Sequence, residues 1–353
     1  MRWQTWIKPL ARLWPFGRQE AHSPPALGRG PVDHVIILDG TMSSLNPGDE
    51  SNAGLTYKLL CSHNSAALSL YYEAGVQWRD WRSTPDVLMG RGINRQIRRA
   101  YGYLASRYRA GDRIFLLGYS RGAYAVRSLA GMIDGVGLLK RAHATERNII
   151  QAYRHYQCGQ GRLAARDFAR AYCHDSAPIE MVGVWDSVKA LGLRLPLLWR
   201  VSEPAHAFHS HQLGPTIRHG FHALALDETR AAFEPVLWDC PPGHTGRVDQ
   251  VWFRGTHGDI GGQLSGFHAA RPLANIPLVW MLERAAECGL SLPEDWKAQF
   301  PTDPTAPSVS TWRYWGKLFL IRKARKPGQT RSERLHPTVQ TGDLTLPMAD
   351  PIA

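Results

Sequence analysis

Short apolar runs alternate with longer segments of helical periodicity from residue 32 onward. The runs that predict strands lie at residues 35–38, 114–117, 179–185 and 248–253. They are largely apolar and end in a polar or glycine-containing turn, which is typical of strands buried on both faces of a parallel sheet. Apolar residues at helical spacing predict helices over 93–108, 123–133 and 276–286.

This alternation predicts an α/β fold with a mostly parallel sheet flanked by helices. Two segments, 140–175 and 189–220, lie outside the alternation and are expected to be helical insertions. Residues 32–353 are predicted to form one domain that includes both insertions. Residues 1–31 are predicted to be a basic, aromatic segment followed by a linker rich in glycine and proline. Tryptophans that alternate with cations there suit a membrane surface, although a tail packed on the domain would look the same.

The chain of 353 residues is strongly basic, with 42 Lys+Arg against 30 Asp+Glu and a net charge of +12. This excess favours anionic partners such as a phospholipid surface, nucleic acid or an acidic substrate. Five widely spaced cysteines without a CxxC pair argue against a disulfide framework or a zinc ribbon. No signal peptide and no apolar run of about 18 residues is found. The cytoplasm is therefore the default location, with peripheral membrane association or export as an effector as the alternatives.

A candidate nucleophile stands at the centre of residues 118–122, which have the form GxSxG around Ser120. The pentapeptide lies between a predicted strand and a predicted helix, which is the context of a nucleophile elbow. In such an elbow the glycines leave room for neighbouring backbone, and the hydroxyl projects above the sheet at the positive end of the helix. The alternative is an ordinary glycine-rich turn.

A serine hydroxyl near neutral pH needs a nearby base and an acid that orients the base. In α/β-hydrolases the chain order is Ser, then Asp or Glu, then His. Asp186 ends the third apolar run and His257 follows the fourth, so both are expected beside Ser120 at the carboxyl edge of the sheet. The alternative acids are Asp134, Asp175 and Asp259, and the alternative base is His336.

Asp39, Gly40 and Thr41 follow the first apolar run. An aspartyl-phosphate motif would need an aspartate two positions before Asp39, and an isoleucine stands there, so that chemistry is excluded. In a hydrolase, the loop after a neighbouring strand and the residue after the nucleophile supply the oxyanion-hole amides. The backbones of Gly40, Thr41 and Arg121 are predicted to fill this role.

Two aspartates are predicted to support loops of the site. Asp39 is expected to brace the loop after the first strand by hydrogen bonds, with a plain Asx turn as the alternative. Asp259 is expected to support the loop that carries His257.

A histidine-rich segment and a basic run offer other chemistry. The histidines are His206, His209, His211, His219 and His222. No HExxH pattern accompanies them, so they predict a histidine-rich insertion, and neither a metal nor another cofactor is expected. The basic run at 322–326 predicts solvated surface, or contact with lipid head groups or phosphates. Nucleic acid is not an expected partner, because no P-loop, zinc finger or aromatic-basic RNA motif is present.

Blocks at residues 38–41, 118–123, 184–188 and 252–262, with a fifth over 222–238, occur together in one order. On these blocks the chain resembles, over about residues 33–290, a bacterial α/β-hydrolase family long catalogued as a domain of unknown function. That family includes type VI secretion phospholipase effectors. The resemblance implies that the family's serine, aspartate and histidine fall on Ser120, Asp186 and His257.

The chain departs from this family at two loops. Met42 and Ser43 stand where the family usually has Asn, and Gly258 stands where it usually has Ser. These positions bear on the substrate more than on hydrolysis itself. The chain also has little room for the membrane-docking modules that some effectors carry.

The leading hypothesis is a serine ester hydrolase of the phospholipase A kind that acts on lipid carboxylic esters and contacts an anionic membrane. The sequence does not indicate an adaptor or immunity protein. The alternative hypothesis is a non-catalytic membrane- or partner-binding protein on a hydrolase scaffold, for which the charge of +12 would be the functional feature. A metal hydrolase that uses the histidine-rich segment ranks third.

Overall fold

The computed structural model describes most of the chain between residues 29 and 349. The described residues are 29–63, 65–75, 91–159, 162–188, 213–239, 246–312, 319, 321–339 and 346–349. Pro31–Ala353 forms one compact unit, and Met1–Gly30 is assigned to another. The predicted basic, aromatic segment lies almost wholly outside the described residues, as does most of the predicted insertion at 189–220.

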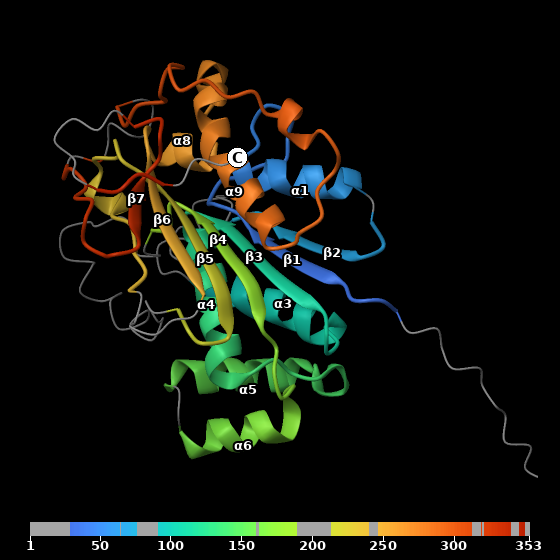
Figure 1. The fold of residues 1–353 in the computed structure, drawn as a ribbon. Coiled ribbons are helices and arrows are strands. Elements are labelled where there is room, and N and C mark those ends of the chain that lie inside the picture. Colours follow the sequence, from blue (N-terminus) through green and yellow to red (C-terminus); the bar gives the residue numbers. More distant parts are fainter. Residues whose placement is uncertain are drawn as a thin grey trace, which may run out of the picture. The chain divides into compact units, whose positions relative to one another are not determined.

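A single sheet of seven strands forms the centre of the described part of the chain, in the order β2-β1-β3-β4-β5-β6-β7 (Figure 1). Every neighbouring pair of strands is parallel. The strands are β1 Asp33–Leu38, β2 Leu68–Glu73, β3 Arg113–Tyr119, β4 Ile179–Trp185, β5 Ile217–Ala225, β6 Arg247–Phe253 and β7 Glu333–Leu335. The predicted α/β fold class is confirmed.

Helices cover both faces of this sheet (Figure 1). They are α1 Asn52–His63, α3 Arg91–Arg107, α4 Arg121–Val136, α5 Glu146–Gln157, α6 Leu163–Tyr172, α8 His257–Gly261 and α9 Arg271–Glu287. Side chains alternate between the faces of a strand. Ile36 and Leu38 of β1 therefore pack with α3 and α4, whereas Val35 and Ile37 pack with α1 and α9. None of the helices in the described ranges has the length and apolar character needed to span a bilayer.

The sequence pattern missed three strands, because none of them is a continuous apolar run. Every residue of β2 is only partly buried, β7 has three residues, and His219, Gly220 and His222 interrupt β5. The predicted insertion at 189–220 extends too far, since residues 217–220 belong to β5. The insertion predicted at 140–175 contains α5 and α6, which Figure 1 shows at the end of the sheet away from α8.

The turn from β3 into α4 requires glycine where three segments of backbone meet. A Cβ atom on Gly122 would lie 2.1 Å from the Leu38 carbonyl oxygen and 2.5 Å from the Asp39 carbonyl oxygen. A Cβ atom on Gly118 would lie 2.7 Å from the carbonyl oxygen of Gly122. The amino end of α4 thus packs directly on the end of β1, and this contact fixes the height of the turn above the sheet.

We expect Gly122→Ala to lower the free energy of unfolding by about 3 kcal/mol, because the clash is with backbone that cannot move aside. Gly131→Ala on the same helix is the matched control, since its Cβ would meet only the Tyr156 side chain, at 3.3 Å. It should stay within about 1 kcal/mol of the parent, helped by the higher helix propensity of alanine. Urea unfolding of both variants measures this, and equal stabilities would contradict the packing argument.

Candidate active site

Ser120 occupies the sharp turn between β3 and α4, at φ 56° and ψ −118°. A positive φ is costly for a residue with a Cβ atom and persists only where the surroundings impose it. Here the Ser120 amide donates to the Trp185 carbonyl at 3.0 Å, and the Tyr124 amide donates to the Ser120 carbonyl at 3.2 Å. The hydroxyl is thereby held at the carboxyl edge of the sheet, beside the positive end of α4.

His257 and Asp186 continue from Ser120 in one chain of hydrogen bonds. His257 Nε2 lies 2.9 Å from Ser120 Oγ, and His257 Nδ1 lies 2.5 Å from Asp186 Oδ2. Asp186 directly follows β4, and His257 begins α8 just after β6. Because parallel strands end at one edge of the sheet, the three side chains meet although they are far apart in sequence. The arrangement can move a proton from the hydroxyl to the imidazole.

Arg325 is a site residue that the sequence analysis missed. Its Nη1 donates to Asp186 Oδ1 at 2.6 Å, and its Nη2 donates to Asp186 Oδ2 at 2.9 Å. Its side chain is 4% exposed, so this member of the basic run 322–326 is not solvated surface. The ion pair joins positions 139 residues apart, and a charge run gives no signal of such a partner.

Asp186 stays ionised despite complete burial. Burial by itself favours the neutral acid, but the charge of Arg325 and the hydrogen bond from His257 outweigh it and hold the pKa of Asp186 far below its usual value. The Ala225 amide also donates to Asp186 Oδ1, at 3.0 Å. The carboxylate is thus a fixed negative charge next to the imidazole.

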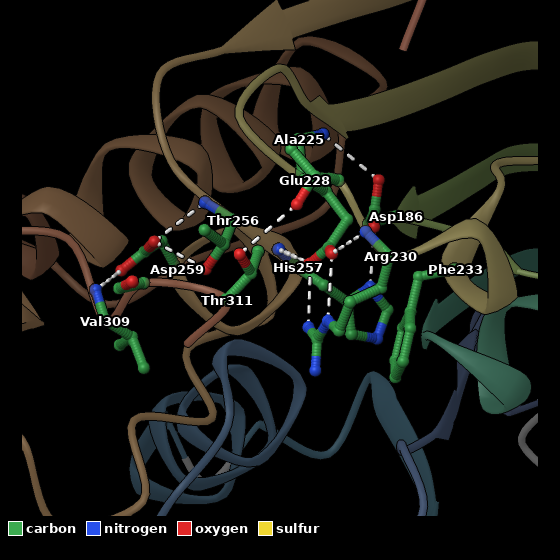
Figure 2. A network of polar contacts seen from close by, with 12 residues as sticks. Asp186, Ala225, Glu228, Arg230, Phe233, Thr256, His257, Asp259, Val309 and Thr311 are labelled. Carbon is green, nitrogen blue, oxygen red and sulfur yellow. Dashed lines mark hydrogen bonds and ion pairs between the residues drawn. The ribbon is translucent and has the colours of Figure 1, made fainter. Parts of the chain in front are cut away.

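Asp259 binds several groups around the turn that carries His257 (Figure 2). Its Oδ2 accepts hydrogen bonds from the Thr256 amide at 2.7 Å and from the Thr256 hydroxyl at 2.8 Å. The Val309 amide donates to its Oδ1 at 2.9 Å, and the Ser308 hydroxyl donates to its Oδ2 at 2.5 Å. Asp259 therefore ties the start of α8 to the loop at 308–309, and it is not the acid paired with His257.

A buried ion pair holds the other side of His257, and Figure 2 shows it next to the imidazole. Glu228 accepts a hydrogen bond from the His257 amide at 3.2 Å and forms a two-pronged pair with Arg230 at 2.7 and 2.8 Å. Burial would raise the pKa of Glu228, but Arg230 lowers it. The Arg230 guanidinium also stacks on Phe233, whose ring centroid is 4.7 Å from that of His257.

Asp39 makes several hydrogen bonds at the loop after β1. Its carboxylate accepts hydrogen bonds from the Ser51 hydroxyl, the Tyr72 hydroxyl at 2.8 Å and the Gly40 amide at 2.6 Å. Burial raises the pKa of Asp39. Because Asp39 occupies the Gly40 amide, the predicted oxyanion donors narrow to Thr41 and Arg121. Gly40 instead allows a close approach, since a Cβ there would lie 2.6 Å from the Tyr119 ring.

The alternative acids and base have other partners. Asp134 accepts hydrogen bonds from the amide and hydroxyl of Thr216. Asp175 precedes β4, at the edge of the sheet opposite to Asp186. His336 stacks on Phe253 at a centroid distance of 4.4 Å, and its Nδ1 lies 2.8 Å from the Thr338 hydroxyl.

The histidine-rich segment forms no metal site within the described residues, where no three His, Cys, Asp or Glu side chains gather to hold a metal ion. His206, His209 and His211 lie outside those residues. His219 and His222 are three positions apart on β5, so they point to opposite faces of the sheet. His222 is buried and accepts a hydrogen bond from the Ser187 amide at 3.1 Å.

The parallel sheet and the chain of hydrogen bonds at its carboxyl edge define a protein of the α/β-hydrolase class. The family model described as "T6SS, Phospholipase effector Tle1-like, catalytic domain" matches residues 33–284. The chain therefore belongs to this family, which confirms the resemblance inferred from its motifs.

Other similar proteins are more distant. The uncharacterized protein YEL023C of Saccharomyces cerevisiae is 26% identical over 234 residues, which are 59% of this chain and 33% of the yeast protein. The chain thus spans about a third of the length of that curated relative. A crystal structure of an uncharacterized protein from Pseudomonas aeruginosa is 17% identical, covers 77% of this chain and 49% of its own, and has a TM-score of 0.43. A structure of the Tle1 effector bound to the VgrG spike of the type VI secretion system is 16% identical, covers 66% and 51%, and has a TM-score of 0.31.

We expect the protein to lose stability as the pH falls from about 7 towards 4, because two histidines resist protonation in the folded state. Burial, assisted by Arg127, lowers the pKa of His222 to about 3, and burial lowers the pKa of His336 to about 4. Unfolded histidine titrates near pH 6.5, so below that pH only the unfolded chain takes up these protons. Each histidine then costs up to about 1.4 kcal/mol per pH unit.

Urea unfolding at pH 7 and pH 5 measures this loss. His336→Phe keeps an aromatic ring against Phe253 and should show a smaller loss between the two pH values than the parent. A loss of the same size in both proteins would contradict the role of His336.

Proposed function

We propose that this protein is a serine ester hydrolase that cleaves carboxylic esters of lipids in the manner of a phospholipase A. The observation that carries the proposal is the hydrogen-bonded chain from Ser120 through His257 to Asp186, at a turn with positive φ. Membership of a family of phospholipase effector catalytic domains supports a lipid as the substrate.

In the proposed reaction Ser120 Oγ attacks the ester carbonyl while His257 Nε2 takes the hydroxyl proton. Asp186 accepts the Nδ1 hydrogen bond and stabilises the imidazolium that forms. The imidazolium then gives its proton to the departing alcohol, which leaves an acyl-serine. Water attacks this ester with the same imidazole as base, and the fatty acid is released.

Charge on the tetrahedral intermediate needs donors that face the attacked carbonyl. The Arg121 amide belongs to the residue after the nucleophile and stands in the first turn of α4. Thr41 follows Gly40. A Cβ atom placed on Gly40 would lie 3.5 Å from Ser120 Cβ, so the loop after β1 runs close to the proposed nucleophile. The Thr41 hydroxyl is buried and has no hydrogen-bond partner within the described residues. We assign the oxyanion to the Arg121 amide and to Thr41.

The loops around the site fit a lipid surface. Met42, Trp312 and Ile321 are 52%, 59% and 62% exposed, although each has a large apolar side chain. Met42 directly follows Thr41, a proposed oxyanion donor. The Ile321 carbonyl accepts a hydrogen bond from the Ala231 amide, two residues before Phe233. The Arg322 guanidinium lies 4.0 Å from the centre of the Trp312 ring. Apolar side chains beside cations are typical of surfaces that contact anionic bilayers.

Family membership also motivates a proposal about delivery. The family model is one of type VI secretion effectors, and the Tle1 effector has been solved bound to a VgrG spike. We include export by such machinery, and contact with a spike protein, in the proposal for this chain. The hydrolytic chemistry does not depend on either.

We expect Ser120→Ala to lower ester hydrolysis by at least about a thousandfold, because the attacking oxygen is lost. Purified protein is assayed on p-nitrophenyl esters and on vesicles of phosphatidylethanolamine and phosphatidylglycerol, and lipid products are identified by mass spectrometry. Ser128→Ala on the same helix is the matched control, since its hydroxyl donates to the Tyr124 carbonyl and lies outside the hydrogen-bonded chain from Ser120 to Asp186. It should keep nearly full activity.

A fluorophosphonate probe provides an independent measurement. It should label the parent and Ser128→Ala but not Ser120→Ala. Full activity of Ser120→Ala, or a parent that neither hydrolyses these substrates nor reacts with the probe, would reject the enzyme. Salt-sensitive vesicle binding without hydrolysis would then favour the non-catalytic binding protein.

A further inference from the structure

We propose that Arg325 is a positioning residue of this site: it orients Asp186 toward His257 and compensates the charge of that carboxylate. The inference rests on the proposed function, since it concerns how well His257 serves as the base. The Arg325 side chain is 4% exposed and acts through the groups that it binds, chiefly Asp186.

The two carboxylate oxygens of Asp186 have different sets of hydrogen-bond donors. Oδ1 accepts from Arg325 Nη1 at 2.6 Å and from the Ala225 amide at 3.0 Å. Oδ2 accepts from Arg325 Nη2 at 2.9 Å and from His257 Nδ1 at 2.5 Å. A planar guanidinium that binds both oxygens prevents rotation of the carboxylate about its Cβ–Cγ bond. Only Oδ2 is then presented to the imidazole.

The same guanidinium ties the acid to two loops. Arg325 Nη1 also donates to the Ala225 carbonyl at 2.7 Å, at the end of β5, and Nη2 donates to the Phe233 carbonyl at 2.5 Å. Phe233 packs against the His257 ring. Arg325 therefore fixes both Asp186 and Phe233, two residues that contact the His257 ring.

The charged groups around His257 show that Arg325 is the partner that compensates Asp186. The charged and titratable groups that face this histidine are Tyr119, Asp186, Glu228, Arg230 and Arg325. Glu228 and Arg230 compensate each other, and burial raises the pKa of Tyr119 so that it stays neutral. The remaining pair is Asp186 and Arg325. Arg325 therefore compensates the charge of the carboxylate that contacts the imidazole.

The test compares the pH dependence of kcat and KM for the full chain, its Arg325→Gln and Arg325→Lys variants, and Lys323→Gln. The control makes the same change from cation to amide two residues away, where the side chain is 59% exposed and pairs with Glu234. The substrate is a p-nitrophenyl ester between pH 4.5 and 8.5, and circular dichroism verifies folding.

For Arg325→Gln we expect the midpoint of the acidic limb of kcat/KM to move up by about one pH unit, because the charge of Asp186 is no longer compensated. For Arg325→Lys the charge remains but the fork is lost, so the midpoint should stay and kcat should fall about tenfold or more, with little change in KM. Lys323→Gln should match the parent in both respects.

Two results would overturn the proposal: a folded Arg325→Gln with the midpoint of the parent, or a folded Arg325→Lys with the kcat of the parent. If Arg325→Gln does not fold, the kcat of Arg325→Lys decides: a tenfold or greater fall supports the proposal, and the kcat of the parent overturns it. If the parent has no esterase activity, the proposed function fails. NMR titration of the His257 imidazole in the same proteins then still tests Arg325. The midpoint of this titration should be higher in Arg325→Gln than in the parent, and equal midpoints would overturn the proposal.

Discussion

Four carboxylates buried at one edge of the sheet set the main constraint on this fold. Asp39, Asp186 and Asp259 are 0% exposed and Glu228 is 1% exposed. A carboxylate in such a place is tolerated only with a counter-charge or a full set of donors. Asp186 and Glu228 each take an arginine, whereas Asp39 and Asp259 bind hydroxyl and amide groups. The loops around Ser120 are fixed in place because they supply the arginines, hydroxyls and amides that these four carboxylates need.

The backbone at the site is bent where the sheet can hold it. Ser120 and Asp186 both have positive φ, and each follows directly on a central strand. The Ser120 amide bonds to the Trp185 carbonyl, and the Asp186 amide bonds to the Ala223 carbonyl. The ladder from β3 through β4 to β5 thus continues into both turns and restrains them. Rigid supports of this kind hold the side chains of Ser120 and Asp186 in fixed relative positions.

The sequence was sufficient to predict the parts of the fold that depend on continuous apolar burial. These are β1, β3, β4 and β6, and their ends predict that Ser120, Asp186 and His257 lie at one edge of the sheet. β5 was missed because His219 and His222 break its apolar run, although the strand lies between β4 and β6. Hydrogen-bond partners such as Gln250, whose side chain bonds to the backbone of Trp238, let polar residues occupy the interior of this sheet. Periodicity cannot detect such compensation.

Arg325 was unpredictable for a related reason. A cation between Lys323 and Lys326 has the same local sequence whether it faces water or a buried carboxylate. Its role depends on a contact across 139 positions, which only the folded chain reveals. Thr41 and Arg121, by contrast, could be predicted as candidates, because they adjoin motifs whose backbone geometry is known in outline.

The segment that matches the family model is shorter than the segment that supports the site. The family match ends at residue 284, whereas Ser308, Val309 and Arg325 come later and bind Asp259 and Asp186. A recombinant fragment trimmed to the matched boundary would contain every residue of the hydrogen-bonded chain. It would also leave Asp186 without its counter-ion and the turn before α8 without half of its anchors. Boundaries chosen by homology alone would therefore remove the supports of the site while leaving its motifs intact.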